Sequence, residues 1–282
     1  MAYPVVSAPF GLKPIDLVGG QQFAGSTRSL PIQYGYATNI FFGDFVQLSR
    51  GNILRLAVTA GSASTFPVGI FLGCSFTDPL TKQKRFSQYW PAGTLSGDAV
   101  AIVTDDPDTI FRAVVCSATT VVGSASTALL GQNLQMIDNA GNVNTGDSLN
   151  AVAAVTATPA TTSTFPVRVV ALISETAITT SATGSSSTTA VTLTGTGLPN
   201  AVIAGSEVGY IASNGQYVHT GSFITANAAA GATSLTLNQT VAAPGSIVAI
   251  PAASTVVITQ YQEVKVKLNF GQHAYYAGLG VA

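Results

Sequence analysis

STFPVGIFLG, from Ser64 to Gly73, shares its first five residues with STFPVRVVAL, from Ser163 to Leu172. Each stretch passes from small polar residues through Phe-Pro-Val into a short apolar run of the kind that forms a buried strand. Proline is tolerated at the first residue of a strand, where its missing N–H is least damaging. Phe66 and Phe165 are therefore predicted to plug a hydrophobic core at matching positions of two related β-units.

The similarity extends upstream of both pentapeptides. GDFVQLSRGNI, residues 43–53, precedes the first, and GQNLQMIDNAGNV, residues 131–143, precedes the second. Each segment begins with glycine, carries a glutamine at the same relative place (Gln47 and Gln135) and reaches a Gly-Asn turn before a second strand. Chance similarity in a chain of low complexity is the alternative, but the agreement in order and spacing favours an internal duplication.

The whole chain consists of short apolar runs separated by turn-forming residues. Gly, Pro, Asn, Asp or Ser interrupts it every few residues, between runs rich in Val, Ile, Thr, Phe and Tyr, and helical periodicity is nearly absent. This pattern predicts an all-β protein, with a β-sandwich or barrel-like (β-tulip-like) parent domain. Strands are predicted within residues 29–36, 44–50, 53–58, 68–76, 85–90, 99–104, 110–115, 133–138, 168–174 and 263–270.

Charge and composition divide the chain further. Residues 1–28 alternate Gly and Pro with isolated apolar side chains, which predicts an extended N-terminal arm. From residue 177 to 262 the sole acidic or basic side chain is Glu207. Residues 179–254 are therefore predicted to form an inserted low-charge β module, with the Ser/Thr-rich connector TTSATGSSSTTA at its start and a hairpin turn at Asn214-Gly215. Residues 29–178 and 255–282 then make up the parent domain with the duplication.

Composition also limits the partners of the chain. Its 282 residues are 47% hydrophobic and 8% charged, with a formal net charge of −1. We expect no direct nucleic-acid partner, because the chain has no excess of positive charge to attract the phosphate backbone. No apolar run reaches the roughly 18 residues of a membrane span, and the first residues lack the pattern of a secretory signal. A soluble chain without a membrane partner is expected.

Residues that catalyse reactions are few. The two histidines, His219 and His273, lie near no Gly-x-Ser-x-Gly or His-x-x-x-His motif; His273 is predicted to be structural and His219 an exposed strand residue. Cys74 and Cys116 are too few for a disulfide framework or a four-cysteine zinc site and are predicted to be buried thiols. We expect no catalytic residue, no cofactor and no metal.

One acidic cluster, TDDPDT, has two interpretations. Asp105, Asp106 and Asp108 could together bind calcium, but the spacing and closing glutamate of an EF-hand are missing. Asp-Pro is also a common way to open a turn after a strand. The turn is favoured.

Several longer segments resemble known proteins. They are APFGLKPIDLVGGQQFAGSTRSLPI, ATNIFFGDFVQL, VGIFLGCSFTDP, FSQYWPAG, DAVAIVTDDPDTIFR and HAYYAGLGV. These segments resemble virion structural proteins of tailed bacteriophages, and are most similar to the head decoration, or cement, proteins of phages of aquatic bacteria. The resemblance covers residues 8–112 best, then 131–172 and the last twenty or so residues. Residues 179–254 lie outside it.

The resemblance implies a non-enzymatic virion protein, made in the host bacterial cytoplasm, that binds the outer surface of the phage head. Such a protein commonly forms a homotrimer and clamps major capsid protein subunits together. Phe10, Leu12 and Phe23 of the arm are expected to bind neighbouring subunits, because these side chains are unfavourable in water. Two alternatives stay open: a phage tail or fibre component that touches host surface glycans, and a secreted polysaccharide-active enzyme. The first would be expected to show long repeats or heptads and the second an export signal, and the sequence shows neither.

Overall fold

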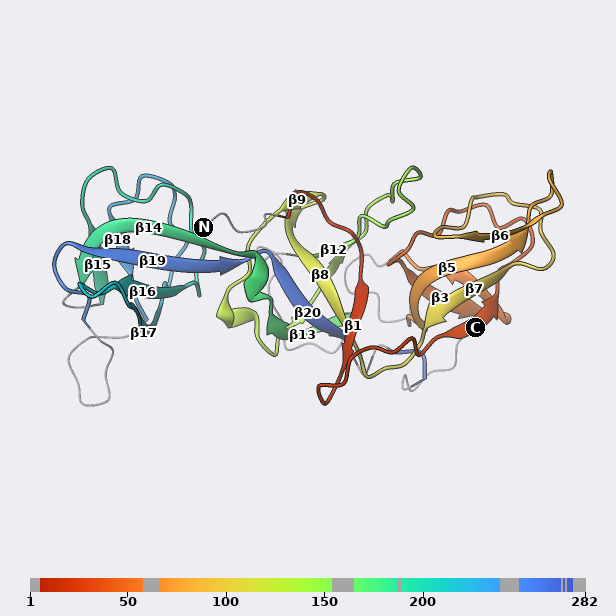
Figure 1. Cartoon of the computed structure of the whole chain (residues 1–282), viewed down its shortest axis with the longest axis horizontal. Helices are drawn as coiled ribbons and strands as arrows, with labels where there is room; N and C mark the ends of the chain where they lie inside the picture. Colours follow the sequence, from red (N-terminus) through yellow and green to blue (C-terminus); the bar gives the residue numbers. More distant parts are fainter. Residues whose placement is uncertain are drawn as a thin grey trace. The chain divides into compact units, whose positions relative to one another are not determined.

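The computed structural model describes residues 6–57, 66–153, 165–186, 189–238, 249–269, 271 and 273–275. These residues form an all-β protein of 20 strands, with two short 3-10 turns at Thr127–Leu129 and Ser174–Thr176 (Figure 1). The fold class predicted from the sequence is confirmed. The chain divides into two compact units: unit 1 comprises residues 1–5, 124–130 and 172–263, and unit 2 comprises residues 6–123, 131–171 and 264–282.

Unit 2 contains two sheets. The first has the strand order β2-β7-β5-β3-β4, and β6 also pairs with β5. Its strands are β2 (Arg28–Pro31), β3 (Phe45–Ser49), β4 (Asn52–Arg55), β5 (Gly69–Thr77), β6 (Lys84–Ser87) and β7 (Val100–Thr104). The second sheet has the order β10-β13-β20-β8-β12-β11, with β1 and β9 also on β8. Its strands are β1 (Lys13–Leu17), β8 (Thr109–Ala118), β9 (Val121–Val122), β10 (Asn133–Leu134), β11 (Met136–Ile137), β12 (Ala151–Ala153), β13 (Val167–Leu172) and β20 (Glu263–Leu268).

The two sheets of unit 2 repeat one topology. The first sheet contains four strands whose order along the chain is β2, β3, β5 and β7, with β4 and β6 between them. In the sheet they lie side by side in the order β2-β7-β5-β3. In the second sheet, β8, β10, β13 and β20 lie in the corresponding order β8-β20-β13-β10. The segments that look alike in sequence supply the second and third strands of each set. The sequence similarity therefore coincides with a repeat of strand order.

The repeat extends to the register of these two strands. Corresponding backbone pairs are Gly43–Phe71, Asp44–Phe71, Phe45–Ile70 and Val46–Gly69 in the first sheet, and Gly131–Val169, Gln132–Val169, Asn133–Arg168 and Leu134–Val167 in the second. Both sets begin at a glycine in the left-handed region, with φ of 91° at Gly43 and 76° at Gly131, where other residues are strained.

Phe66 and Phe165 do not occupy equivalent positions in this register. Phe66 lies three residues before Gly69, whereas Phe165 lies two residues before Val167, the residue that corresponds to Gly69. A shift of one residue turns a side chain to the other face of a strand. Phe165 is 8% exposed and Phe66 is only half-buried. The prediction of two matching core plugs is therefore wrong, although both strands are placed correctly.

Large aromatic side chains fill the core of the first sheet. Trp90, Phe71 and Phe76 are almost entirely buried, and the rings of Phe76 and Trp90 meet edge to face with centroids 5.3 Å apart. The indole N–H of Trp90 donates to the carbonyl oxygen of Tyr36 at 3.3 Å, so this polar atom is satisfied inside the core.

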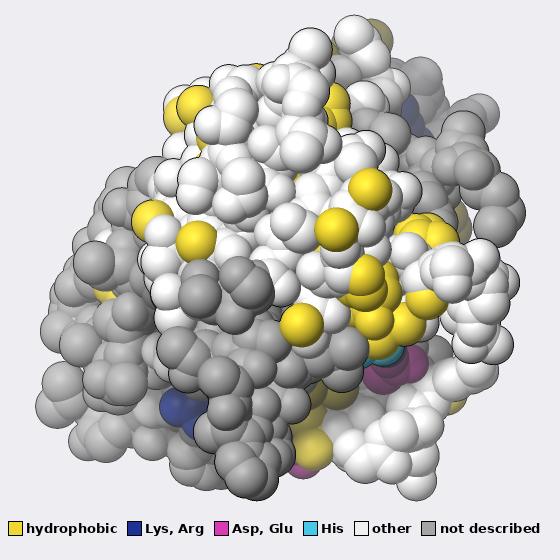
Figure 2. Space-filling model, turned by 90° about the vertical axis from the view of Figure 1, so that its left-hand side faces the viewer, with side chains coloured by type: hydrophobic (Ala, Val, Ile, Leu, Met, Phe, Trp, Pro, Cys, Tyr) yellow, Lys and Arg dark blue, Asp and Glu magenta, His cyan; other side chains and the backbone are white. Residues whose placement is uncertain are grey.

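Unit 1 is built on a sheet with the order β17-β16-β19-β14-β15-β18. Its strands are β14 (Ala177–Ser186), β15 (Ala190–Leu193), β16 (Glu207–Ile211), β17 (Tyr217–Phe223), β18 (Ser234–Thr236) and β19 (Ser254–Tyr261). The face shown in Figure 2 carries few charged side chains, in keeping with the composition of this part of the chain. The hairpin predicted at Asn214-Gly215 is confirmed, because it joins β16 to β17 and Ile211 pairs with Tyr217.

The segment TTSATGSSSTTA is not a connector. Most of it belongs to β14, which pairs with β19 from Ala177–Tyr261 to Gly184–Ser254. Its side chains alternate between faces: Thr180 is buried and Thr179 is exposed. Threonine favours strands because its branched Cβ packs well on a pleated surface, so a Ser/Thr-rich segment can form a strand when a partner strand is present.

The predicted N-terminal arm also contains regular structure. Residues 13–17 form β1, which runs antiparallel to β8 with Lys13 opposite Arg112. Among the described residues, no helix is long and apolar enough to cross a membrane.

Candidate functional site

The three apolar side chains expected to bind neighbours are placed within unit 2. Leu12 has no exposed surface, so it contributes to the core of its own unit. Phe10 is half-buried and packs against the cluster of Val114, Cys116 and Ala151. Phe23 is also half-buried. The sequence identified these side chains as needing cover, and the fold of their own unit supplies much of it.

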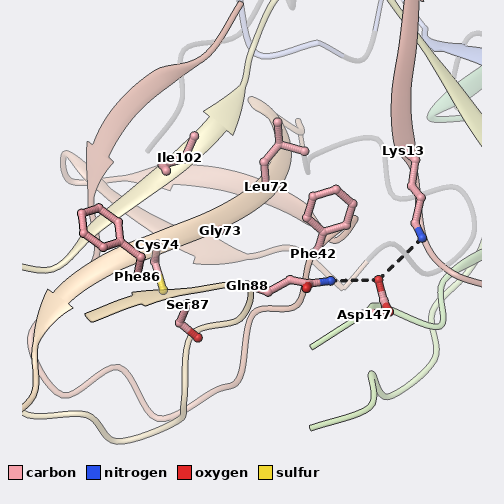
Figure 3. Close-up of a pocket in the computed structure, with 10 residues that line it drawn as sticks. All are labelled: Lys13, Phe42, Leu72, Gly73, Cys74, Phe86, Ser87, Gln88, Ile102 and Asp147. Atoms are coloured by element: carbon pink, nitrogen blue, oxygen red, sulfur yellow. Dashed lines mark hydrogen bonds and ion pairs between the residues drawn. The ribbon is translucent and has the colours of Figure 1, made fainter. Parts of the chain in front are cut away.

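A different part of unit 2 presents a hollow to solvent, with a volume of about 550 Å³ (Figure 3). Its lining residues are Lys13, Phe42, Leu72, Gly73, Cys74, Phe86, Ser87, Gln88, Ile102 and Asp147. It lies where β5 changes neighbours, since residues 69 and 70 pair with β3 and residues 74–77 pair with β6. Gly73 has a φ of 142°, and a Cβ there would lie 3.0 Å from the Ser87 carbonyl oxygen, so glycine is needed at this change of partner.

One end of the hollow is polar and internally neutralised. The Gln88 side-chain amide donates to Asp147 Oδ1 at 3.0 Å, and Lys13 Nζ lies 3.7 Å from the same oxygen. The Lys13 ammonium also lies 4.6 Å from the centroid of the Phe10 ring and 5.9 Å from that of Phe42. These contacts hold the charges in fixed positions (Figure 3).

The other end of the hollow is apolar and continues onto the β5–β6 hairpin. Phe86 is 80% exposed, and Leu80, in the turn of the hairpin, is 90% exposed. The turn is held by Asp78, whose carboxylate accepts the N–H of Leu80 at 2.8 Å and pairs with Arg85 at 3.0 Å. We call Leu80, Phe86 and the hollow the β5–β6 surface. Large exposed apolar side chains beside a hollow make this surface the candidate binding site of unit 2.

A buried polar cluster joins segments that are adjacent in sequence to residues lining the hollow. Asp44 has no exposed surface, and its carboxylate accepts hydrogen bonds from Ser148 Oγ at 2.6 Å, Asn150 Nδ2 at 3.0 Å and Arg55 Nε at 2.9 Å. Burial raises the pKa of Asp44, while the Arg55 guanidinium and the donated hydrogen bonds act against that rise. The sequence contained no signal for this cluster, because its members are far apart along the chain.

The cluster fixes two segments that line the hollow. The Phe42 N–H donates to the Gly146 carbonyl oxygen at 3.0 Å, and the Ser148 N–H donates to the Phe42 carbonyl oxygen at 2.9 Å. Phe42 and Asp147, on either side of these bonds, are thereby held in place.

The acidic cluster at residues 105–108 forms a turn, as favoured from the sequence. Asp106 accepts the backbone N–H of Asp108 at 2.9 Å, and Asp105 pairs with Arg28. The Asp105 and Asp106 carboxylates therefore have different partners. Within the described part of the chain, no group of three or more His, Cys, Asp or Glu side chains is arranged to hold a metal.

Neither histidine is among the residues that line the hollow. His273 is fully buried in unit 2, and burial lowers its pKa. Its Nδ1 accepts the backbone N–H of Tyr275 at 3.2 Å, a structural contact. His219 lies on β17 with most of its side chain exposed, as predicted.

Both cysteines are buried free thiols, as predicted. Burial raises the pKa of Cys74 to about 12 and that of Cys116 to about 11. Because the thiolate is the reactive form, we expect iodoacetamide at pH 8 to modify the folded chain at least about a hundredfold more slowly than the urea-unfolded chain. Mass spectrometry over time measures both rates. Equal rates would contradict the burial of these thiols.

Comparison of the chain with protein-family models, with curated proteins and with solved structures finds no match.

Proposed function

We propose that this chain is a decoration, or cement, protein of a bacteriophage virion that binds the outer surface of the capsid through the β5–β6 surface. In this role it has no catalytic activity and stabilises contacts between major capsid protein subunits. The observation that carries the proposal is the position of this surface in the sequence. Leu80, Phe86 and all residues that line the hollow except Asp147 lie within residues 8–112, the part that most resembles decoration proteins.

The chemistry of the surface suits a protein partner. Burying Leu80 and Phe86 in a partner would each contribute about 1.5–3 kcal/mol before ordering costs. The charges of Lys13 and Asp147 are already paired with each other, so contact requires little desolvation of unpaired ions. A homotrimer would present three such surfaces to the capsid and raise the avidity of binding.

The test is a capsid-binding assay with Leu80→Ser and Phe86→Ser, alone and together. The capsids are those of the virus whose genome encodes this chain, stripped of the protein. Both side chains are exposed, so the variants are expected to fold normally. We expect each single variant to bind at least about tenfold more weakly, because the lost burial exceeds 1.4 kcal/mol.

Val121→Ser is the matched control, since Val121 is 58% exposed on β9 of the same unit and lies outside the β5–β6 surface. It is expected to bind as the unmodified chain does. Sedimentation of the free chain measures the trimer separately. Undiminished binding by the double variant would refute the assigned surface, and failure of the unmodified chain to bind capsids would refute the function.

A further inference from the structure

Unit 1 has a groove of its own on one face of its sheet, with a volume of about 460 Å³. Its lining residues are Thr179, Ser181, Ile211, Tyr217, Thr255, Val257 and Thr259. They come from β14, β19, β16 and β17, which are consecutive neighbours in the sheet. The register places Thr179 opposite Thr259, Ser181 opposite Val257, and Ile211 opposite both Thr255 and Tyr217. The groove therefore crosses the middle of the sheet.

Gly209 gives the groove its shape. It pairs with Val257 on one side and His219 on the other, and a Cβ at this position would lie 2.3 Å from the Tyr217 hydroxyl oxygen. The missing side chain lets the Tyr217 ring lie across the strand, and its hydroxyl forms a hydrogen bond with the Thr259 side chain. An aromatic ring, 37% exposed, is thus fixed as one wall of the groove.

Glu207, the sole acidic side chain between residues 177 and 262, is linked to this wall through His219. The His219 ring meets Tyr217 edge to face with centroids 4.6 Å apart, and His219 Nδ1 lies 2.6 Å from Glu207 Oε1. Figure 2 shows a histidine and an acidic side chain beside a group of hydrophobic side chains. Burial and the nearby Glu207 carboxylate raise the pKa of Tyr217.

We propose that this groove binds a neutral saccharide. The hydroxyls of Thr179, Ser181 and Thr255 can each donate and accept a hydrogen bond, which matches the hydroxyls of a sugar. The Tyr217 ring, with Val257 and Ile211, offers an apolar surface to the C–H face of a pyranose.

The same residues argue against other ligand classes. No lysine or arginine lies between residues 177 and 262, so the groove has no cation for a phosphate, a sulfate or a carboxylated sugar. An extended peptide binds most readily along the edge of a sheet. The groove instead crosses β16, β19 and β14, each of which has a neighbour on both sides.

The experiment uses the full chain on an array of immobilised neutral, sialylated and sulfated oligosaccharides, and titration calorimetry measures the affinity for the best neutral binder. Tyr217→Ala, which removes the wall, is expected to weaken binding at least about tenfold. Ser181→Ala, which removes one hydroxyl from an exposed position, is expected to weaken it about three- to tenfold. Phe223→Ala is the matched control, because Phe223 is 40% exposed on the same strand and does not line the groove; its affinity is expected to be unchanged.

Thermal unfolding verifies that each variant is folded. If Tyr217→Ala unfolds, Tyr217→Phe keeps the ring and is expected to retain most of the affinity, and Ser181→Ala still decides the location. Absence of binding to every neutral oligosaccharide, binding confined to acidic ones, or an affinity unchanged in Ser181→Ala and, where that variant folds, in Tyr217→Ala would each overturn the proposal. None of these outcomes depends on capsid binding, which the β5–β6 surface variants test separately.

Discussion

Replacing Asp44 by alanine is expected to lower the free energy of unfolding by about 3–5 kcal/mol, the usual loss when one partner of a buried ion pair is removed. The substitution leaves the half-buried Arg55 without the carboxylate that lies 2.9 Å from its Nε. It also removes the acceptor for Ser148, Asn150 and the backbone N–H of Phe41. Buried donors without an acceptor add to the loss. Urea unfolding, followed by tryptophan fluorescence of the buried Trp90, measures the change.

Asp108→Ala is the control for this prediction. The Asp108 carboxylate is 67% exposed and lies 3.7 Å from Lys267, a distance typical of a weak surface pair. Its removal is expected to change the unfolding midpoint very little. An equally small effect of Asp44→Ala would contradict the role of the buried cluster in holding the walls of the hollow.

The second large effect is expected at Phe165. Phe165→Ala should lower the free energy of unfolding by about 3–5 kcal/mol, since it leaves a cavity where a nearly buried ring was packed. Phe66→Ala is the comparison, and its loss should be clearly smaller because the Phe66 ring is only half-buried. Both are measured by the same urea titration. Equal losses would mean that the two rings are equivalent after all, as the shared pentapeptide first indicated.

Much of the fold was predictable because the signals for strands are local. Each of the ten predicted strand segments overlaps a strand of the structure, from β2 at Arg28–Pro31 to β20 at Glu263–Leu268. The alternation of side chains and the turn residues between segments are sufficient for that. The Asn-Gly turn between Tyr210 and Tyr217 was predictable for the same reason.

The errors arose where a strand depends on a distant partner. The Ser/Thr-rich segment of β14 resembles a linker on its own, and only the pairing with β19, more than sixty residues later, makes it a strand. The sequence KPIDL of β1 contains proline and has little pattern, and it is ordered by β8 about a hundred residues away. Local propensity carries no information about such pairings.

The candidate sites were harder to predict than the strands, for the same reason. The sequence marks Glu207 as the sole charge of its segment and His219 as an exposed strand residue, but nothing in the spacing shows that these two residues and Tyr217 form one wall. Their grouping follows from the register of β16 and β17, with its irregularity between Val208 and Gly209. Likewise, the exposure of Phe86 depends on where β5 stops pairing with β3 and begins to pair with β6. In the sequence this point is marked only by Gly73.

The connection between β13 and β20 has an evolutionary consequence. These two strands are neighbours in the second sheet of unit 2, and the chain between them forms most of unit 1. In the first sheet the corresponding connection, from β5 to β7, contains only the β6 hairpin. Because the entropic cost of closing a loop rises only slowly with its length, the connection between these two strands can be a short hairpin or an entire module. Recombination within this connection can therefore exchange one module for another in a single step. A lineage can in this way acquire a new binding specificity without altering the two sheets of unit 2.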